Sequence, residues 1–134
     1  MPNEPIHIVR FKEMAGFILG RLYEEHPAAL QFEASEFYQN DVPSDEDAEL
    51  FDNTVNYLVR NGYVHQDSQY FLQLTSAAWD VLQKPNPLLP VETVGSSLMK
   101  WGKDATSDVA KGLAGKTVDA ALSAVAVAIG AIAG

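Results

Sequence analysis

Cysteine is absent from the 134 residues, as are the usual sequence patterns of catalytic and metal-binding proteins. Without a thiol the chain forms no disulfide, no thiolate metal site and no cysteine nucleophile. The three histidines, His7, His26 and His65, stand apart from one another, so no paired zinc ligands are predicted. Phosphate-binding glycine loops and the serine-hydrolase motif are also missing. We therefore expect no enzymatic activity, no metal and no cofactor.

Basic residues are scarce, and the charge is unevenly distributed. Residues 1–84 hold five lysines and arginines against fourteen aspartates and glutamates, a net charge of −9. Residues 85–134 hold four basic and four acidic side chains, so the whole negative excess belongs to the first part. A field of that sign repels nucleic-acid phosphates and attracts basic proteins. No basic stretch followed by an apolar run opens the sequence, so we expect no signal peptide and a cytoplasmic location.

Apolar periodicity and turn residues predict several helices and one hairpin in the first part of the chain. The predicted elements are helices over residues 8–25, 27–38, 45–60 and 76–84 and strands over residues 63–65 and 70–74. Ser44, with Asp47 three residues later, is a helix-capping signature. Gly62 suits the left-handed end of the third helix, because glycine enters that backbone region at little cost.

The run from Val55 to Val64, the hairpin, and the run from Phe71 to Leu82 together resemble the winged helix-turn-helix superfamily. Members typically have an apolar helix that ends in L-x-x-x-G-(Y/L)-(I/V), a two-stranded wing, and a strand that leads into L-T-x-x-G. This chain has Ala78 in place of the last glycine, a change between small residues. The resemblance covers about residues 8–84. It implies a mainly α fold with a small β-hairpin wing for a domain over residues 1–84.

In DNA-binding members of the superfamily the third helix contacts the major groove. Here the start of that helix carries carboxylates where base and phosphate contacts need basic or amide side chains. These residues, our candidate site for a partner with a basic surface, are Asp45, Glu46, Asp47, Glu49 and Asp52. The wing tip, residues 66–69, also lacks a basic residue. The sequence predicts a protein-binding winged helix without the basic DNA-binding face; a merely solvated acidic face is the other interpretation of these side chains.

Three prolines between residues 85 and 90 mark a boundary. They indicate either a Pro-rich interdomain linker or a loop that joins two packed helices. The segment 91–134 that follows changes from an amphipathic helical pattern to an uncharged Ala/Gly-rich run. That run is shorter than the roughly 20 apolar residues that cross a membrane.

Three interpretations of the C-terminal segment remain open. It contacts a membrane through residues 117–134, it assembles copies into a homo-oligomer, or it packs on the winged helix. The residues expected to carry self-association or membrane contact are Trp101, Leu122, Val125, Ala126, Ile129, Gly130 and Gly134. The function expected from both parts is that of a non-catalytic adaptor or effector. The alternative is a winged-helix transcriptional regulator that uses the C-terminal helix to dimerise.

Overall fold

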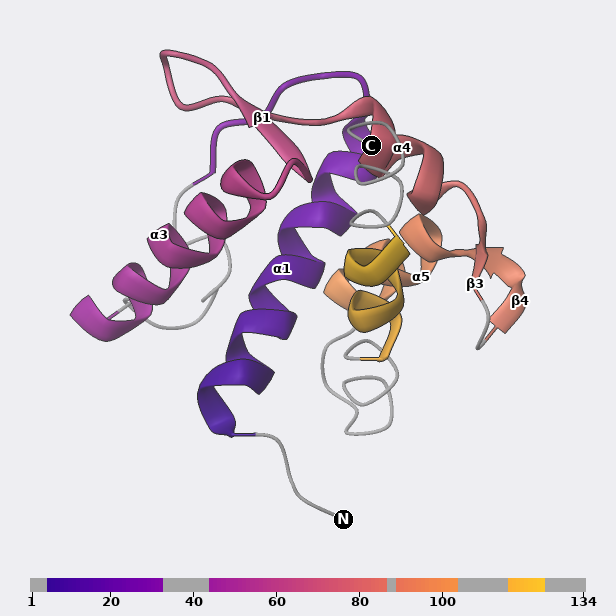
Figure 1. Ribbon diagram of the computed structural model, residues 1–134, viewed down its shortest axis with the longest axis horizontal. Coiled ribbons are helices and arrows are strands. Elements are labelled where there is room, and N and C mark those ends of the chain that lie inside the picture. Colours follow the sequence, from indigo (N-terminus) through magenta and orange to yellow (C-terminus); the bar gives the residue numbers. More distant parts are fainter. Residues whose placement is uncertain (1–4, 33–43, 87–88, 104–115, 125–134) are drawn as a thin grey trace.

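The computed structural model describes residues 5–32, 44–86, 89–103 and 116–124, and it is mainly helical with two small antiparallel hairpins (Figure 1). The helices are α1 (Ile6–Glu25), α3 (Asp45–Arg60), α4 (Ser76–Leu82), α5 (Val94–Lys103) and a further helix over residues 116–124. The strands are β1 (Val64–Gln66), β2 (Leu72–Leu74), β3 (Pro85–Asn86) and β4 (Leu89–Thr93). The predicted mainly α fold with a small hairpin is confirmed at this level. The element order and the pairing of β1 with β2 are compatible with a winged-helix layout.

Helix α1 runs through the middle of the described structure, between α3 on one side and α5 with the helix 116–124 on the other (Figure 1). It packs more extensively on α5 than on α3. Two glycines allow the close approach of α1 and α5. A Cβ added at Gly20 would lie 2.9 Å from the carbonyl carbon and oxygen of Leu98, and one added at Gly95 would overlap the ring of Tyr23.

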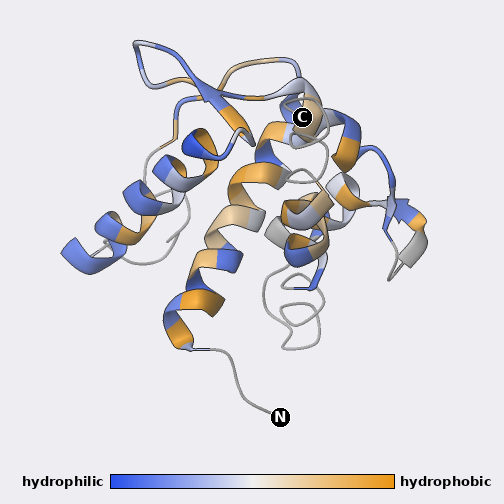
Figure 2. Cartoon of the chain, in the orientation of Figure 1, coloured by the Kyte–Doolittle hydropathy of each residue, from blue (hydrophilic) through white to orange (hydrophobic). Residues whose placement is uncertain are grey.

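One apolar core extends across the proline-rich boundary, and Figure 2 shows the apolar residues gathered along α1 and the elements that face it. The core joins residues of α1, α3, α4 and the β1–β2 hairpin to residues from beyond the boundary. Those later residues, Val94, Leu98, Val118 and Ala121, are each at most 4% exposed. Residues 85–86 and 89–93 form the β3–β4 hairpin. Described residues before and after this hairpin therefore belong to the same core cluster.

The local signals for helix ends act as the sequence predicts. Ser44 Oγ accepts a hydrogen bond from the Asp47 N–H at 3.1 Å, and the Asp47 carboxylate accepts one from the Ser44 N–H at 3.3 Å. This reciprocal capping box starts α3. Gly62 follows the end of α3 with a φ of 81°, in the left-handed region. Thr75 Oγ1 accepts from the Ala78 N–H at 3.2 Å and caps α4.

The predicted helix over residues 27–38 is wrong in its described part. Residues 27–32 contain a turn and an isolated β-bridge. Leu30 and Leu72 exchange two backbone hydrogen bonds, of 2.8 and 2.7 Å, so Leu30 lies along the edge of β2. Backbone groups that are bonded to Leu72 are not available to a helix, which explains why the apolar spacing here did not produce one. Residues 33–38 lie outside the described residues.

Candidate functional site

The outward side of α3 carries the five carboxylates that the sequence singled out. The residues of α3 buried against the core are Phe51, Thr54, Val55 and Leu58. Asp45, Glu46, Glu49 and Asp52 are exposed, whereas Asp47 is half-buried in the capping box. Within the part of the chain that the structure describes, none of the five forms an ion pair. The helix dipole favours the three in the first turn but not Glu49 or Asp52, which lie beyond that turn.

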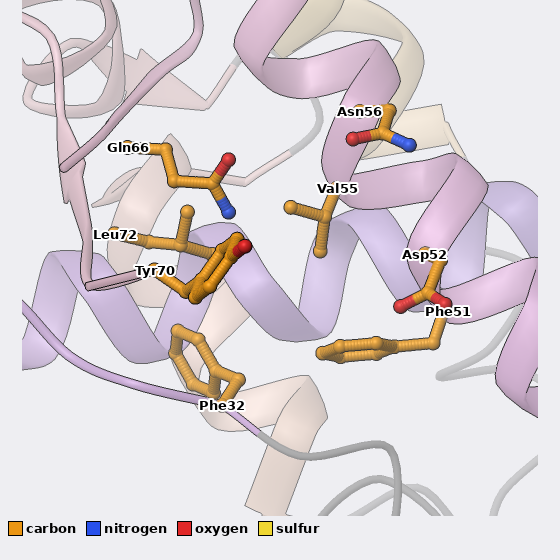
Figure 3. Close-up of a pocket in the computed structure, with 8 residues that line it drawn as sticks. All are labelled: Phe32, Phe51, Asp52, Val55, Asn56, Gln66, Tyr70 and Leu72. Carbon is orange, nitrogen blue, oxygen red and sulfur yellow. The ribbon is translucent and has the colours of Figure 1, made fainter. Parts of the chain in front are cut away.

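A pocket of about 430 Å³ opens between α3 and the β1–β2 hairpin, next to these carboxylates (Figure 3). It is lined by Phe32, Phe51, Asp52, Val55, Asn56, Gln66, Tyr70 and Leu72. Phe51, Val55 and Leu72 are buried and give the pocket an apolar base, while Asp52 and Tyr70 are exposed at its rim. Among the described residues that line the pocket, Asp52 carries the only charge. The site therefore combines apolar and aromatic surface with one carboxylate and two amides.

Tyr70 is held over the pocket by the turn of the hairpin. Its side chain is 71% exposed, and its φ of 67° lies in the left-handed region that few residues other than glycine adopt. The side chain of Asp67 organises the turn, because its Oδ1 accepts hydrogen bonds from the N–H groups of Gln69 at 2.8 Å and Phe71 at 3.0 Å. The Tyr70 N–H in turn donates to the carbonyl oxygen of Asp67 at 3.1 Å.

The helix 116–124 is attached to the body of the molecule by charged and polar contacts. Lys12 of α1 forms an ion pair with Asp119, with 2.9 Å between Nζ and Oδ1. The Tyr63 hydroxyl donates to the carbonyl oxygen of Leu122 at 3.0 Å. Burial, and to a lesser degree the neighbouring Tyr57, raises the pKa of Tyr63 above the ordinary tyrosine value. The hydroxyl therefore keeps the proton that it donates.

A buried amide joins the same helix to the β3–β4 hairpin and α5. Asn86 is fully buried, and its Nδ2 donates to Ser97 Oγ at 3.0 Å and to Thr117 Oγ1 at 3.2 Å. Ser97 donates to a carboxylate oxygen of Glu92 at 2.7 Å, and Lys100 donates to the other at 2.7 Å. The hydrogen bonds from Lys100 and Ser97 lower the pKa of Glu92 below its ordinary value.

The residues predicted for self-association or membrane contact are only partly within the described structure. Leu122 is half-buried and packs against the core. Trp101 lies in α5. The remaining predicted residues, Val125, Ala126, Ile129, Gly130 and Gly134, lie outside the described residues. Within the four described ranges, no helix is long and apolar enough to cross a membrane.

The histidines lie in separate parts of the structure. His7 is on α1, His65 is on β1, and the ring of His26 stacks on Trp79 with 3.9 Å between centroids. The Nδ1 of His26 is buried and has no hydrogen-bond partner among the residues that the structure describes. Among the described residues, no three histidine, aspartate or glutamate side chains are grouped so that they could hold a metal ion.

Sequence reasoning placed Asp52 in the candidate site but missed the pocket beside it. Phe32, Asn56, Gln66 and Tyr70, which also line the pocket, were not among the predicted site residues. A signal was present, since Tyr70 directly follows a polar turn, at a position where glycine or asparagine is usual. No protein-family model matches the chain, and no curated protein or solved structure shows significant similarity to it.

Proposed function

We propose that the chain is a non-catalytic protein-recognition module of the winged-helix class, which binds a basic segment of another protein along the outward side of α3. One observation carries the proposal: Glu49 and Asp52 are exposed and unpaired among the described residues, beyond the first turn of α3. Neither helix capping nor the helix dipole accounts for them. Asp52 also borders an open pocket, so charge and accessible apolar surface lie together.

The charge of the first part of the chain supports a protein partner over duplex DNA. Residues 1–84 carry a net charge of −9, and the stretch 33–43, which precedes α3, contains no lysine or arginine. Phosphate backbones would meet repulsion here, whereas a basic peptide would gain long-range attraction that weakens with salt. The transcriptional-regulator alternative has no comparable observation in its favour. Association of copies, or membrane contact, through residues 117–134 together with Trp101 remains part of the proposal on the sequence alone.

The proposal is tested with a fluorescein-labelled peptide of alternating lysine and glycine around one central arginine. Fluorescence anisotropy at low and high salt should show binding that weakens as salt rises. The double variant Glu49→Gln/Asp52→Asn should bind about 3- to 10-fold more weakly, because two exposed charge contacts are lost. Neither substitution touches the capping box, so the melting temperature should change little.

The matched control is Glu25→Gln/Asp80→Asn, which removes two exposed carboxylates elsewhere on the molecule. It makes the net charge less negative by the same amount and should leave peptide affinity nearly unchanged. Equal losses in the two double variants would show a response to net charge alone and would contradict a site on α3. Binding of a labelled DNA duplex at low salt, with no binding of the peptide, would instead favour the regulator.

A further inference from the structure

We propose that the pocket between α3 and the β1–β2 hairpin takes an arginine side chain of the bound segment, an inference that rests on the function proposed above. The walls of the pocket are aromatic on both sides. Figure 3 shows the ring of Phe51 extending from the α3 side, while the rings of Phe32 and Tyr70 lie across the opening from it. A flat cationic group inserted there would lie against aromatic faces, which attract cations and stack on guanidinium groups.

The charges and polar groups of the lining favour a cation over an apolar side chain. Asp52 is the charged member of the described lining, and Glu49 lies one turn earlier on the same helix. The amides of Asn56 and Gln66 also border the opening and form no side-chain hydrogen bond within the described residues. A purely apolar occupant would leave these groups without partners, whereas a guanidinium group has five N–H donors for one carboxylate and two amide oxygens.

The backbone of Tyr70 gives a second, independent reason to assign a ligand to this pocket. A left-handed conformation costs a residue with a Cβ about 1 kcal/mol or more, and glycine or asparagine would form the same turn with less strain. The hydrogen bonds of Asp67 hold the turn, yet they involve the backbone and make no use of the tyrosine ring. The side chain remains 71% exposed at the mouth of the pocket, where a ligand can reach it.

Arginine fits these features better than lysine. Its planar guanidinium can stack between rings and still donate in its own plane to a carboxylate. Lysine places a compact, strongly hydrated ammonium at the same depth and loses more hydration there. We therefore expect selectivity for arginine over lysine at one position of an otherwise basic segment.

The experiment compares four labelled peptides that share the lysine–glycine flanks and differ only at the centre: arginine, lysine, citrulline and leucine. Full-length protein should bind the arginine peptide roughly tenfold more tightly than the other three. Tyr70→Asn should abolish that preference with an unchanged or higher melting temperature, because asparagine tolerates the left-handed backbone. Tyr70→Phe should retain the preference, since it keeps the ring.

The outcomes separate this inference from the proposed function. Equal binding of all four peptides would leave recognition of a basic segment intact and overturn the arginine pocket. The tightest binding by the leucine peptide would show an apolar occupant, and arginine selectivity that survives Tyr70→Asn would place the contact elsewhere; either result overturns the inference. Absence of binding by every peptide at low salt would overturn the proposed function and this inference together.

Discussion

At the scale of single residues, Gly20 and Gly95 set how near α1 and α5 can approach. The obstacle at Gly20 is the backbone of Leu98, which cannot rotate out of the way. The obstacle at Gly95 is the ring of Tyr23, whose hydroxyl lies 3.1 Å from Thr93 Oγ1. A methyl group at Gly95 would require the Tyr23 ring to move, and one at Gly20 would require α1 and α5 to separate. The two glycines therefore act through the space they leave for the facing helix.

Replacing Gly20 with alanine should destabilise the protein. Alanine improves helix propensity by about 1 kcal/mol, but overpacking against the Leu98 backbone costs about 1–3 kcal/mol and requires the helices to separate. Because the obstacle at Gly20 is backbone, we take the upper part of that cost, about 2–3 kcal/mol, and expect a net fall of about 1–2 kcal/mol in the free energy of unfolding, measured by urea denaturation. The control Asn53→Ala, at an exposed position of α3, should change it by no more than about 0.5 kcal/mol. A Gly20→Ala protein as stable as the parent would refute the close approach.

At the scale of elements, the structural features that depend on neighbouring residues could be predicted from the sequence. Those that depend on residues distant along the chain could not. Ser44 with Asp47 and Gly62 predicted the ends of α3, because capping needs only neighbours within a turn. Nothing near Leu30 indicates that its backbone pairs with Leu72. Nothing near Asn86 indicates that a residue between two prolines is fully buried by partners 11 and 31 residues away. The same limit applies to the pocket, which is assembled from three separate segments.

The β4–α5 connection should depend on pH through Glu92. The hydrogen bonds from Lys100 and Ser97 hold its pKa below the ordinary value, so folding favours the ionised carboxylate. The contribution of the ionised Glu92 to the stability of the folded protein is fully present above the ordinary glutamate pKa of about 4.3. It is lost as the pH falls through the lowered pKa of Glu92 in the folded protein. Glu92→Gln should therefore lower the melting temperature at neutral pH, and the difference from the parent should disappear in acid.

Thermal melts of the parent and Glu92→Gln over a range of pH measure this effect. Lys100→Gln removes one of the two donors to Glu92 and should lose part of the same stabilisation. Because the two residues interact, the double variant Glu92→Gln/Lys100→Gln should lower the melting temperature by less than the sum of the two single changes. A melting-temperature difference that stays constant into strong acid would contradict the role given to the ionised carboxylate.

At the scale of the whole molecule, α1 is the element that the two parts of the chain share. The later part covers α1 with Val94, Leu98, Val118 and Ala121. Each large apolar side chain buried in this way contributes about 1.5–3 kcal/mol, and a typical domain is stable by only about 5–15 kcal/mol. The packing of the later part is thus comparable to the entire margin of stability.

A chain that ends at Pro90 should for this reason fail to fold as a compact unit. It keeps the predicted winged-helix segment 1–84 but exposes the face of α1 that α5 covers. We expect loss of a sharp thermal transition in circular dichroism and early elution or aggregation in size-exclusion chromatography. A cooperative melt at the temperature of the full chain would show that residues 1–90 close their core alone.

The Lys12–Asp119 contact spans 107 residues of sequence, and this separation has a consequence for synthesis on the ribosome. Helix α1 emerges from the ribosome well before α5 and the helix 116–124, which cover its apolar face. Contacts so distant in sequence slow folding. Until they form, the exposed apolar surface of α1 promotes aggregation. The nascent chain should accordingly depend on chaperone binding to α1 until those later segments have emerged.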